Sequence, residues 1–222
     1  MNSTSSTLRL GCSAPNFDAQ TTKGPINFYE WAKGSWVVFF CHPADFTPVC
    51  TTELGEISRL QSEFEKRGVK IIGLSANDLK SHEEWIRDIN EVAQTTLTFP
   101  IIADADRKVA LLYDMVDHQD ATNVDQKGMA LTIRSVFFID PLHTVRLILT
   151  YPAAVGRNTG EILRCLDALQ LTEKHQVATP VNWQKGDEVV VHASLSNEQA
   201  NNRFGDFKII KPYLRMTTQP AF

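Results

Sequence analysis

The sequence predicts an α/β fold in which a mixed central sheet has flanking helices and a small α+β extension follows at the C-terminus. Between residues 36 and 113, short apolar runs typical of buried strands alternate with segments of helical periodicity. Two further strand-like runs are joined by the short turn 141–143, which indicates an antiparallel hairpin. Near Leu171 the composition shifts and apolar residues become sparse. These observations predict one α/β domain followed by a smaller part.

Length and composition support this division. The chain has 222 residues, of which 43% are hydrophobic and 22% charged, so it can form one full domain and a smaller second part. We place the boundary after Leu171, which gives a main domain at 1–171 and an extension at 172–222. A chain of this size buries about 70% of its unfolded surface, so its core needs neither disulfides nor a metal ion. The extension would be marginal alone, which predicts that it packs on the main domain or serves dimerisation.

The first strand is expected at 36–40, where a continuous apolar run indicates burial on both faces. The next helix is expected to have Thr47 as a side-chain N-cap, Pro48 at N1 and Cys50 at N3, and to end at Gly68. A strand is expected next at 69–75, followed by a helix that a capping box of Ser81 and Glu84 opens. A further strand is expected at 99–103, followed by a helix at 109–113 capped near Asp106.

The pattern then changes to antiparallel strands. The hairpin strands are expected at 132–140 and 144–151. A last long helix is expected to follow, with Asn158 or Thr159 as its cap. Parallel units followed by a hairpin and a helix fit a thioredoxin-like fold. In the extension we expect a strand at 189–191, a short helix capped by Ser196, and strands at 207–210 and 213–216.

Charge and hydropathy narrow the choice of partners. The net charge is −4 and no basic run is present, which argues against nucleic acid as a partner. No apolar run approaches the roughly 20 residues of a membrane span, so we expect no membrane partner. Residues 1–7 lack the apolar segment of a secretory signal, which favours a cytoplasmic location. They are also rich in Ser and Thr, free of acidic residues and soon followed by Arg9, so a mitochondrial location is the alternative.

Four cysteines are scattered along the chain: Cys12, Cys41, Cys50 and Cys165. They are too sparse for a secreted disulfide scaffold, and no C-x-x-C pair indicates zinc or a redox disulfide. Individual thiols in a reducing compartment are the expected state. Cys41 and Cys165 lie in apolar segments and are predicted to be packing residues, whereas Cys12 has no predicted role.

Cys50 is the candidate for chemistry. The positive end of a helix and its free N–H groups favour a thiolate and lower the pKa of a cysteine in the first turn. A first-turn cysteine can also be a small buried hydrophobic residue. The Thr47 side chain can cap the helix, or its hydroxyl can contact a substrate and the sulfur, and the two roles are compatible. Pro43 and Pro48 stiffen the loop that leads to Cys50.

Three further side chains are candidates for this site. Arg134 stands in the apolar run 132–139, where a guanidinium needs an anion unless it faces water, and either a carboxylate or a thiolate would serve. Arg157 stands at a helix start, where a cation is unfavourable and so hints at an anion. His42 beside Cys41 lacks the ligand spacing of a zinc site, so we expect a structural histidine and no metal.

A resemblance to a known family brings these residues together. The run Pro43-Ala44-Asp45-Phe46-Thr47-Pro48-Val49-Cys50 resembles the peroxiredoxin active-site loop, P-x-x-x-[TS]-x-x-C. Segments 127–129, 151–153, 156–158 and 179–183 resemble the one-cysteine subgroup, so the similarity extends over nearly the whole chain. The resemblance implies that Cys50 is the peroxidatic cysteine and that Thr47 and Arg134 orient it and the peroxide. It also implies that Pro43 shapes the pocket, that His42 lies near the sulfur and that Arg157 supports the arginine cluster.

The resemblance also implies a function. It predicts a thiol-dependent peroxidase for hydrogen peroxide and organic hydroperoxides, which works through a Cys50 sulfenic acid, needs no cofactor and serves antioxidant defence. Residues 172–222 contain no cysteine, so the C-terminal resolving cysteine of two-cysteine relatives is missing. An external thiol, glutathione or thioredoxin, is therefore the expected reductant, with resolution by Cys12, Cys41 or Cys165 as the second choice. A homodimer is the assembly that the resemblance implies.

Two other classes of function remain to be compared with this one. A redox sensor or holdase would use the oxidation of Cys50 to change assembly and would not turn over. Some one-cysteine relatives are credited with phospholipase activity from a G-x-S-x-G-like motif, for which Ser35 is the matching serine here. The trailing Gly is absent, and Tyr29 and Leu142 occupy the positions expected for the His and Asp partners. Without a base, Ser35 cannot be activated, so we do not expect this activity.

Overall fold

The computed structural model describes residues 8–222. The chain is divided into two compact units, and the boundary along the sequence lies between Thr159 and Gly160. The predicted boundary after Leu171 lies inside helix α6 (Thr159–Lys174). The expectations for residues 1–7 lie outside the described residues. Within residues 8–222, no helix is both long and apolar enough to cross a membrane.

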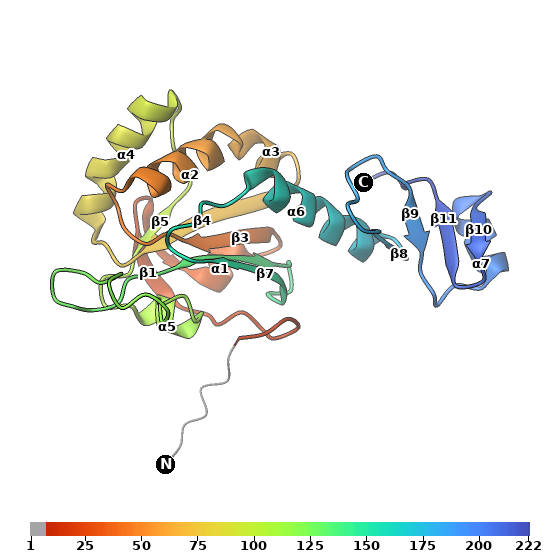
Figure 1. Ribbon diagram of the computed structural model, residues 1–222, viewed down its shortest axis with the longest axis horizontal. Helices are drawn as coiled ribbons and strands as arrows, with labels where there is room; N and C mark the ends of the chain where they lie inside the picture. Colours follow the sequence, from red (N-terminus) through yellow and green to blue (C-terminus); the bar gives the residue numbers. More distant parts are fainter. Residues whose placement is uncertain (1–7) are drawn as a thin grey trace, which may run out of the picture. The chain divides into compact units, whose positions relative to one another are not determined.

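The first unit is built on a mixed sheet with the strand order β2-β1-β5-β4-β3-β6-β7 in the described chain (Figure 1). Strands β3, β4 and β5 are parallel, and the other pairs are antiparallel. The strands are β1 (Asp18–Thr21), β2 (Gly24–Asn27), β3 (Trp36–Cys41), β4 (Val69–Ser75), β5 (Ile101–Ala103), β6 (Arg134–Ile139) and β7 (Val145–Tyr151). The predicted mixed sheet and the β6–β7 hairpin are confirmed.

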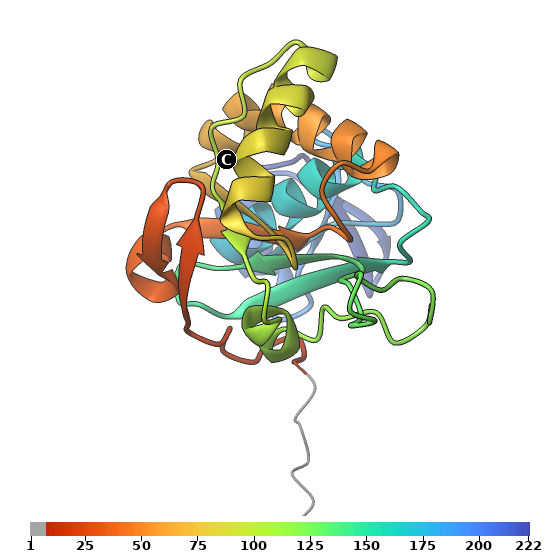
Figure 2. The same ribbon diagram turned by 90° about the vertical axis from the view of Figure 1, so that its left-hand side faces the viewer.

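The helices of this unit are α1 (Phe28–Ala32), α2 (Pro48–Arg59), α3 (Gln61–Glu65), α4 (Leu79–Ala93) and α5 (Lys108–Leu112). Helices α2 and α4 lie on one side of the sheet and α5 on the other (Figure 2). At Gly55 the two larger helices approach so closely that a Cβ there would lie 2.6 Å from Cβ of Ala93. This contact between α2 and α4 fixes the helix that carries Cys50.

Two predicted helix boundaries are wrong. The helix expected to run to Gly68 is divided at Leu60 into α2 and α3. Helix α4 starts at Leu79, and its cap is Asp78, whose carboxylate accepts from the N–H of Ser81. Helix α5 is capped near Asp106 as predicted, because the carboxylate of Asp106 accepts from the N–H of Lys108, the first residue of the helix. The carboxylate of Asp104 accepts from the next two amides.

The β1–β2 hairpin and α1 were not predicted. Their segments are short, and β1 has only one buried residue, so neither shows a clear period of apolar residues. Side chains from these segments nevertheless complete the core on one face of the sheet. The aromatic residues packed together there are Phe17, Phe28, Phe39, Tyr113 and Phe137.

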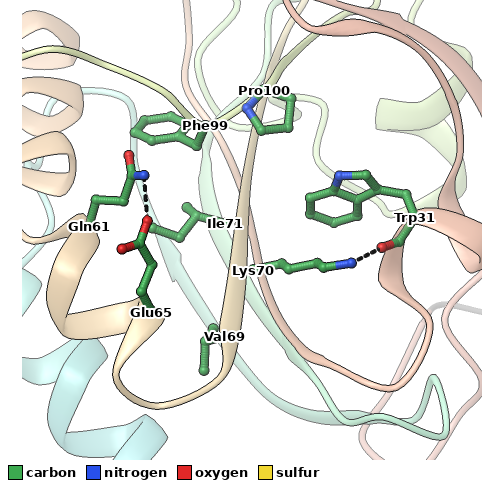
Figure 3. Close-up of a pocket in the computed structure, with 8 residues that line it drawn as sticks. All are labelled: Trp31, Gln61, Glu65, Val69, Lys70, Ile71, Phe99 and Pro100. Atoms are coloured by element: carbon green, nitrogen blue, oxygen red, sulfur yellow. Dashed lines mark hydrogen bonds between the residues drawn. The ribbon is translucent and has the colours of Figure 1, made fainter.

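The start of β4 lines a pocket of about 200 Å³ (Figure 3). Pairing between β4 and β5 begins at Gly73, because Pro100 has no N–H to offer the carbonyl of Ile71. Lys70 lies over the ring of Trp31 and donates to its carbonyl oxygen on one side of the strand, while Gln61 donates to Glu65 on the other. None of the residues predicted for the active site lines this pocket.

The second unit continues from α6 into a small sheet with the strand order β10-β11-β9-β8. Its other elements are β8 (Val177–Ala178), β9 (Val189–Val191), α7 (Asn197–Phe204), β10 (Lys208–Lys211) and β11 (Leu214–Thr217). The predicted cap at Ser196 is confirmed as a capping box with Gln199. Leu171, Val177, Trp183 and Val189 form a core of its own, as expected for an α+β extension.

Candidate active site

Cys50 lies at the third position of α2, directly after the loop that leaves β3. Thr47 is extended at the N-cap and Pro48 opens the helix, so the predicted N3 position is confirmed. The Cys50 side chain is 0% exposed. The N–H groups of Val49 and Cys50 have no hydrogen-bond partner within residues 8–222, so they are free to bind an anion.

Thr47 does not cap α2 through its side chain, so that prediction is wrong. Its hydroxyl instead donates to the carbonyl oxygen of Ala44 at 2.9 Å. The one hydroxyl proton is therefore used within the loop, and the oxygen keeps lone pairs that can accept from a bound molecule. The hydroxyl proton is thus directed at Ala44 and not at the sulfur of Cys50.

Arg134 is the first residue of β6, and its side chain is buried. Its Nη1 lies 3.3 Å from Sγ of Cys50 and 2.6 Å from Oε2 of Glu53. Its Nε donates to the carbonyl oxygen of Ala153 at 2.8 Å. The sequence left a carboxylate and a thiolate as alternative partners for this arginine, and the structure places a carboxylate and the Cys50 sulfur in contact with it.

Glu53, one turn after Cys50 on α2, is a site residue that the sequence did not reveal. Its carboxylate accepts from Arg134 and from the backbone N–H, Nε and Nη2 of Arg157, the last at 2.6 Å. Burial alone would raise the pKa of Glu53, but the two guanidinium groups hold it below its usual value. Glu53 is the anion that the position of Arg157 indicated. The signal available in the sequence was its spacing of three from Cys50.

The charged side chains around the sulfur of Cys50 carry a net positive charge. Arg134 and Arg157 bring two positive charges into a buried space, and Glu53 supplies one negative charge. Arginine stays protonated in proteins, so one positive charge remains uncompensated. The guanidinium of Arg134 is in direct contact with Sγ of Cys50. The buried charges therefore place an excess of positive charge against this sulfur.

His42 belongs to a second polar cluster, which it forms with Asp45 and His82. Nε2 of His42 lies 3.0 Å from Oδ1 of Asp45, and Nδ1 of His82 lies 2.8 Å from Oδ2 of the same carboxylate. The three groups fall within 4.8 Å of one another, at separations that hydrogen bonds account for. His42 and Pro43 are buried as the loop turns. Neither Asp45 nor His82 was singled out from the sequence.

The other cysteines differ from Cys50. Burial raises the pKa of Cys41 to about 11, and its Sγ donates to the carbonyl oxygen of Ile133. Burial and the neighbouring Glu161 raise the pKa of Cys165 to about 12. Both are buried, as predicted for packing residues, while Cys12 is exposed.

Ser35 has no activating base at the positions where one was sought. The hydroxyl of Tyr29 donates to the carbonyl oxygen of Ala14 at 2.7 Å, and its ring stacks on His143 with centroids 4.0 Å apart. Leu142 is 83% exposed. The contacts of Tyr29 are thus structural, and the exposed apolar side chain of Leu142 cannot orient a base.

Comparison with known proteins identifies the family. Residues 10–148 match the AhpC/TSA family, and residues 168–206 match the C-terminal domain of 1-Cys peroxiredoxin. Peroxiredoxin PRX1, mitochondrial, from Saccharomyces cerevisiae is 56% identical over 95% of this chain and 80% of that protein.

Two solved structures agree with this match. A cysteine-to-serine mutant of the peroxiredoxin 6 of Arenicola marina has a TM-score of 0.93 at 43% identity, over 97% of this chain and 100% of that one. The yeast mitochondrial 1-Cys peroxiredoxin, solved in a study of thiol resolution via glutathione/thioredoxin systems, has a TM-score of 0.86 at 54% identity, over 95% of this chain and 99% of that one. The chain therefore belongs to the one-cysteine peroxiredoxins of the AhpC/TSA family and is a thiol peroxidase.

Proposed function

We propose that Cys50 is the peroxidatic cysteine and that it reduces hydrogen peroxide and small organic hydroperoxides. The observation that carries this proposal is the contact of 3.3 Å between Nη1 of Arg134 and Sγ of Cys50, in a buried cluster that lacks one negative charge. A thiolate is the reactive form of cysteine, so the cluster keeps the sulfur ready for attack.

The reaction transfers one oxygen atom to the sulfur. The Cys50 thiolate attacks the terminal peroxide oxygen, the O–O bond breaks, and its electron pair leaves with the second oxygen. That oxygen takes up a proton from solvent and departs as water or an alcohol, while Cys50 becomes a sulfenic acid. Arg134 and the free N–H groups of Val49 and Cys50 stabilise the negative charge on the leaving oxygen. Thr47 accepts from the peroxide O–H, and Pro43 and Arg157 hold the surrounding structure.

The reductant that we propose is an external thiol, either glutathione or thioredoxin. Attack of a thiol on the sulfenic acid forms a mixed disulfide and releases water, and a second thiol restores Cys50. Residues 172–222 contain no cysteine, and burial with a raised pKa disfavours Cys41 and Cys165 as resolving thiols. The yeast relative was described with glutathione/thioredoxin systems, which supports the same two choices here.

We further propose a homodimer, in which the second unit serves dimerisation, and a role in antioxidant defence. The four free cysteines support the cytoplasmic location that we propose, and the mitochondrial name of the yeast relative supports the alternative. Sedimentation of the purified chain tests the dimer, and organelle fractionation tests the location. A monomer at working concentrations, or recovery in neither compartment, would contradict these two assignments.

The central test is peroxide consumption with thioredoxin or glutathione supplied separately. Cys50→Ser is expected to abolish turnover with both, and wild type is expected to form one sulfenic acid per chain. Single changes of Cys41 and Cys165 to Ser are matched controls and should retain turnover, and Cys12→Ser tests the exposed thiol. Wild-type activity in Cys50→Ser would refute the assignment of Cys50.

A further inference from the structure

We infer that Asp45 and His82 form a buried carboxylate–imidazolium pair that positions the active-site loop and keeps His42 uncharged. Asp45 lies in the middle of the loop that precedes Cys50, and His82 lies on α4. Both side chains are wholly buried. This inference rests on the proposed function of Cys50 only for its effect on rate, because the protonation states can be measured independently.

The charge of His82 follows from what each neighbouring atom can donate. Its Nε2 lies 3.1 Å from the carbonyl oxygen of Ile102, which can only accept, so Nε2 carries a hydrogen. Its Nδ1 lies 2.8 Å from Oδ2 of Asp45, so Nδ1 carries a hydrogen as well if that carboxyl is ionised. A ring with both nitrogens protonated is an imidazolium cation.

Asp45 has the surroundings of an ionised carboxyl. Its Oδ2 accepts from the Ser81 hydroxyl at 2.7 Å in addition to His82, and its Oδ1 faces Nε2 of His42 at 3.0 Å. Burial raises the pKa of Asp45, but the hydrogen bonds from the two histidines outweigh it and hold the pKa well below its usual value. The Ser75 hydroxyl also donates to Oδ1, at 3.4 Å, and four donors directed at one carboxylate stabilise the anion.

His42 meets the same carboxylate but has a different environment at its other nitrogen. Its Nε2–H donates to Asp45, whereas its Nδ1 is buried without a hydrogen-bond partner within residues 8–222. A proton on Nδ1 would be an unsatisfied buried donor beside the positive charges of His82 and Arg157, so the neutral ring is preferred. Burial lowers the pKa of His42, in agreement with that choice. One carboxylate thus holds one charged and one neutral histidine.

The pair also fastens the loop. The N–H of Asp45 donates to Oδ1 of Asn77 at 3.0 Å, and Asn77 in turn donates to the Ser81 hydroxyl. Two residues after Asp45, Thr47 begins α2 and so sets where the N–H groups of Val49 and Cys50 point. Asp45 and His82 are therefore positioning residues, which act on the peroxide through the loop and not by contact.

The direct test is the long-range ¹H–¹⁵N spectrum of the histidine side chains in the unmodified protein, in buffer with a chelator. His82→Gln and His42→Gln serve only to assign signals. Between about pH 6 and 8, where a free histidine titrates, His82 should show two protonated nitrogens and His42 a proton on Nε2 alone. A neutral His82 or a charged His42 would overturn the inference. This measurement does not depend on peroxidase activity or on stability of the variants.

The functional test is a double-mutant cycle on the rate constant for oxidation of Cys50 by hydrogen peroxide. Asp45→Asn and His82→Gln are each expected to lower this rate about ten- to a hundredfold through misplacement of the loop. The double variant removes both charges together, and its rate constant should fall by less than the product of the fold-decreases in the two single variants. His118→Gln is the control, because that histidine is 73% exposed, and it should react at the wild-type rate.

Two outcomes separate this inference from the proposed function. Single effects that multiply in the double variant, with the pH profile of the reaction unshifted in each, would show that Asp45 and His82 do not act as a unit. Wild-type turnover in Cys50→Ser would instead refute the role of Cys50, and the histidine spectra would still decide whether the charged pair exists.

Discussion

Cys41 and Cys50 stand at the two ends of one loop, and both are completely buried. Around Cys41 the sulfur meets backbone groups, since it donates to the carbonyl of Ile133 and accepts from the N–H of Ser135. Around Cys50 the sulfur meets the guanidinium of Arg134. Burial raises the pKa of Cys41 to about 11, which keeps it a thiol at neutral pH. Exposure therefore does not distinguish the two cysteines, whereas the charge in contact with the sulfur does.

Arg157 connects the two regions. Its Nη1 donates to the carbonyl oxygen of Cys41 at 2.8 Å, while its other nitrogens bind Glu53 on α2. Its guanidinium also lies over the ring of Phe40, 4.9 Å from the centroid. One arginine thus holds the end of β3 against the helix of Cys50, so changes in the charged cluster should affect stability as well as rate.

The largest effect on stability is expected for Glu53→Gln. The change leaves two buried guanidinium groups without their shared anion, and breaking such a cluster costs about 3–5 kcal/mol of the free energy of unfolding. Urea titration measures it. Glu56→Gln on the same helix is the control, because Glu56 pairs with Arg59 at the surface and should contribute no more than about 1 kcal/mol. Equal losses in the two variants would contradict the importance of the buried cluster.

The next effect is on rate. Arg134→Met removes the cation beside Cys50, and loss of one such donor to a developing charge lowers rates about 10²- to 10³-fold. Stopped-flow oxidation by hydrogen peroxide gives the rate constant. Arg59→Met, on the exposed part of α2, is the matched control. If Arg134→Met reacted as fast as this control, the contact with Arg134 would not be what distinguishes the environment of Cys50 from that of Cys41.

The sequence predicted the local features of this site better than the distant ones. Pro48 and Cys50 were placed correctly because the start of a helix is encoded by adjacent residues. The burial of Arg134 required an anion, but only the fold shows that Glu53 and Cys50 reach the same nitrogen. His82 comes from another helix and carries no local signal of its partner.

Some local patterns were misleading for a physical reason. Ser81 and Glu84 have the spacing of a capping box, yet Asp78 lies nearer the true helix start and takes the amide of Ser81. Thr47 has a side chain that often caps helices, but its hydroxyl donates to the carbonyl oxygen of Ala44 instead. Spacing alone does not reveal which of two acceptors or donors a tertiary contact will favour.

A smaller effect is expected for Cys41→Ala. The peroxidase rate should stay within about twofold of wild type, while loss of the buried sulfur lowers the free energy of unfolding by about 1 kcal/mol. Turnover with glutathione and urea titration check the two parts. A variant that reacts with peroxide once and then stalls would mean that Cys41 resolves the sulfenic acid, contrary to its raised pKa.

The smallest effect is a change of stability with pH. Glu53 and Asp45 have pKa values held below the usual 4.5 and 3.8 in the folded protein. The stability from such groups is fully present above the unfolded pKa and is lost as pH falls below it. The free energy of unfolding should therefore be insensitive to these groups at neutral pH and decrease below about pH 4.5, with a shallower decrease in Glu53→Gln. Parallel curves for the two proteins would contradict the assigned direction.

The uncapped start of α2 has a consequence for the second half of the catalytic cycle. A peroxide is small, but glutathione and thioredoxin are not, and the Cys50 side chain is 0% exposed. A thiol of that size can reach the sulfur only when the first helical turn opens. With no side-chain cap from Thr47, that turn is the end of α2 that frays most easily, whereas Gly55 locks the middle of the helix onto α4. In the cycle that we propose for Cys50, the frequency of this fraying therefore sets an upper limit on the rate of reduction.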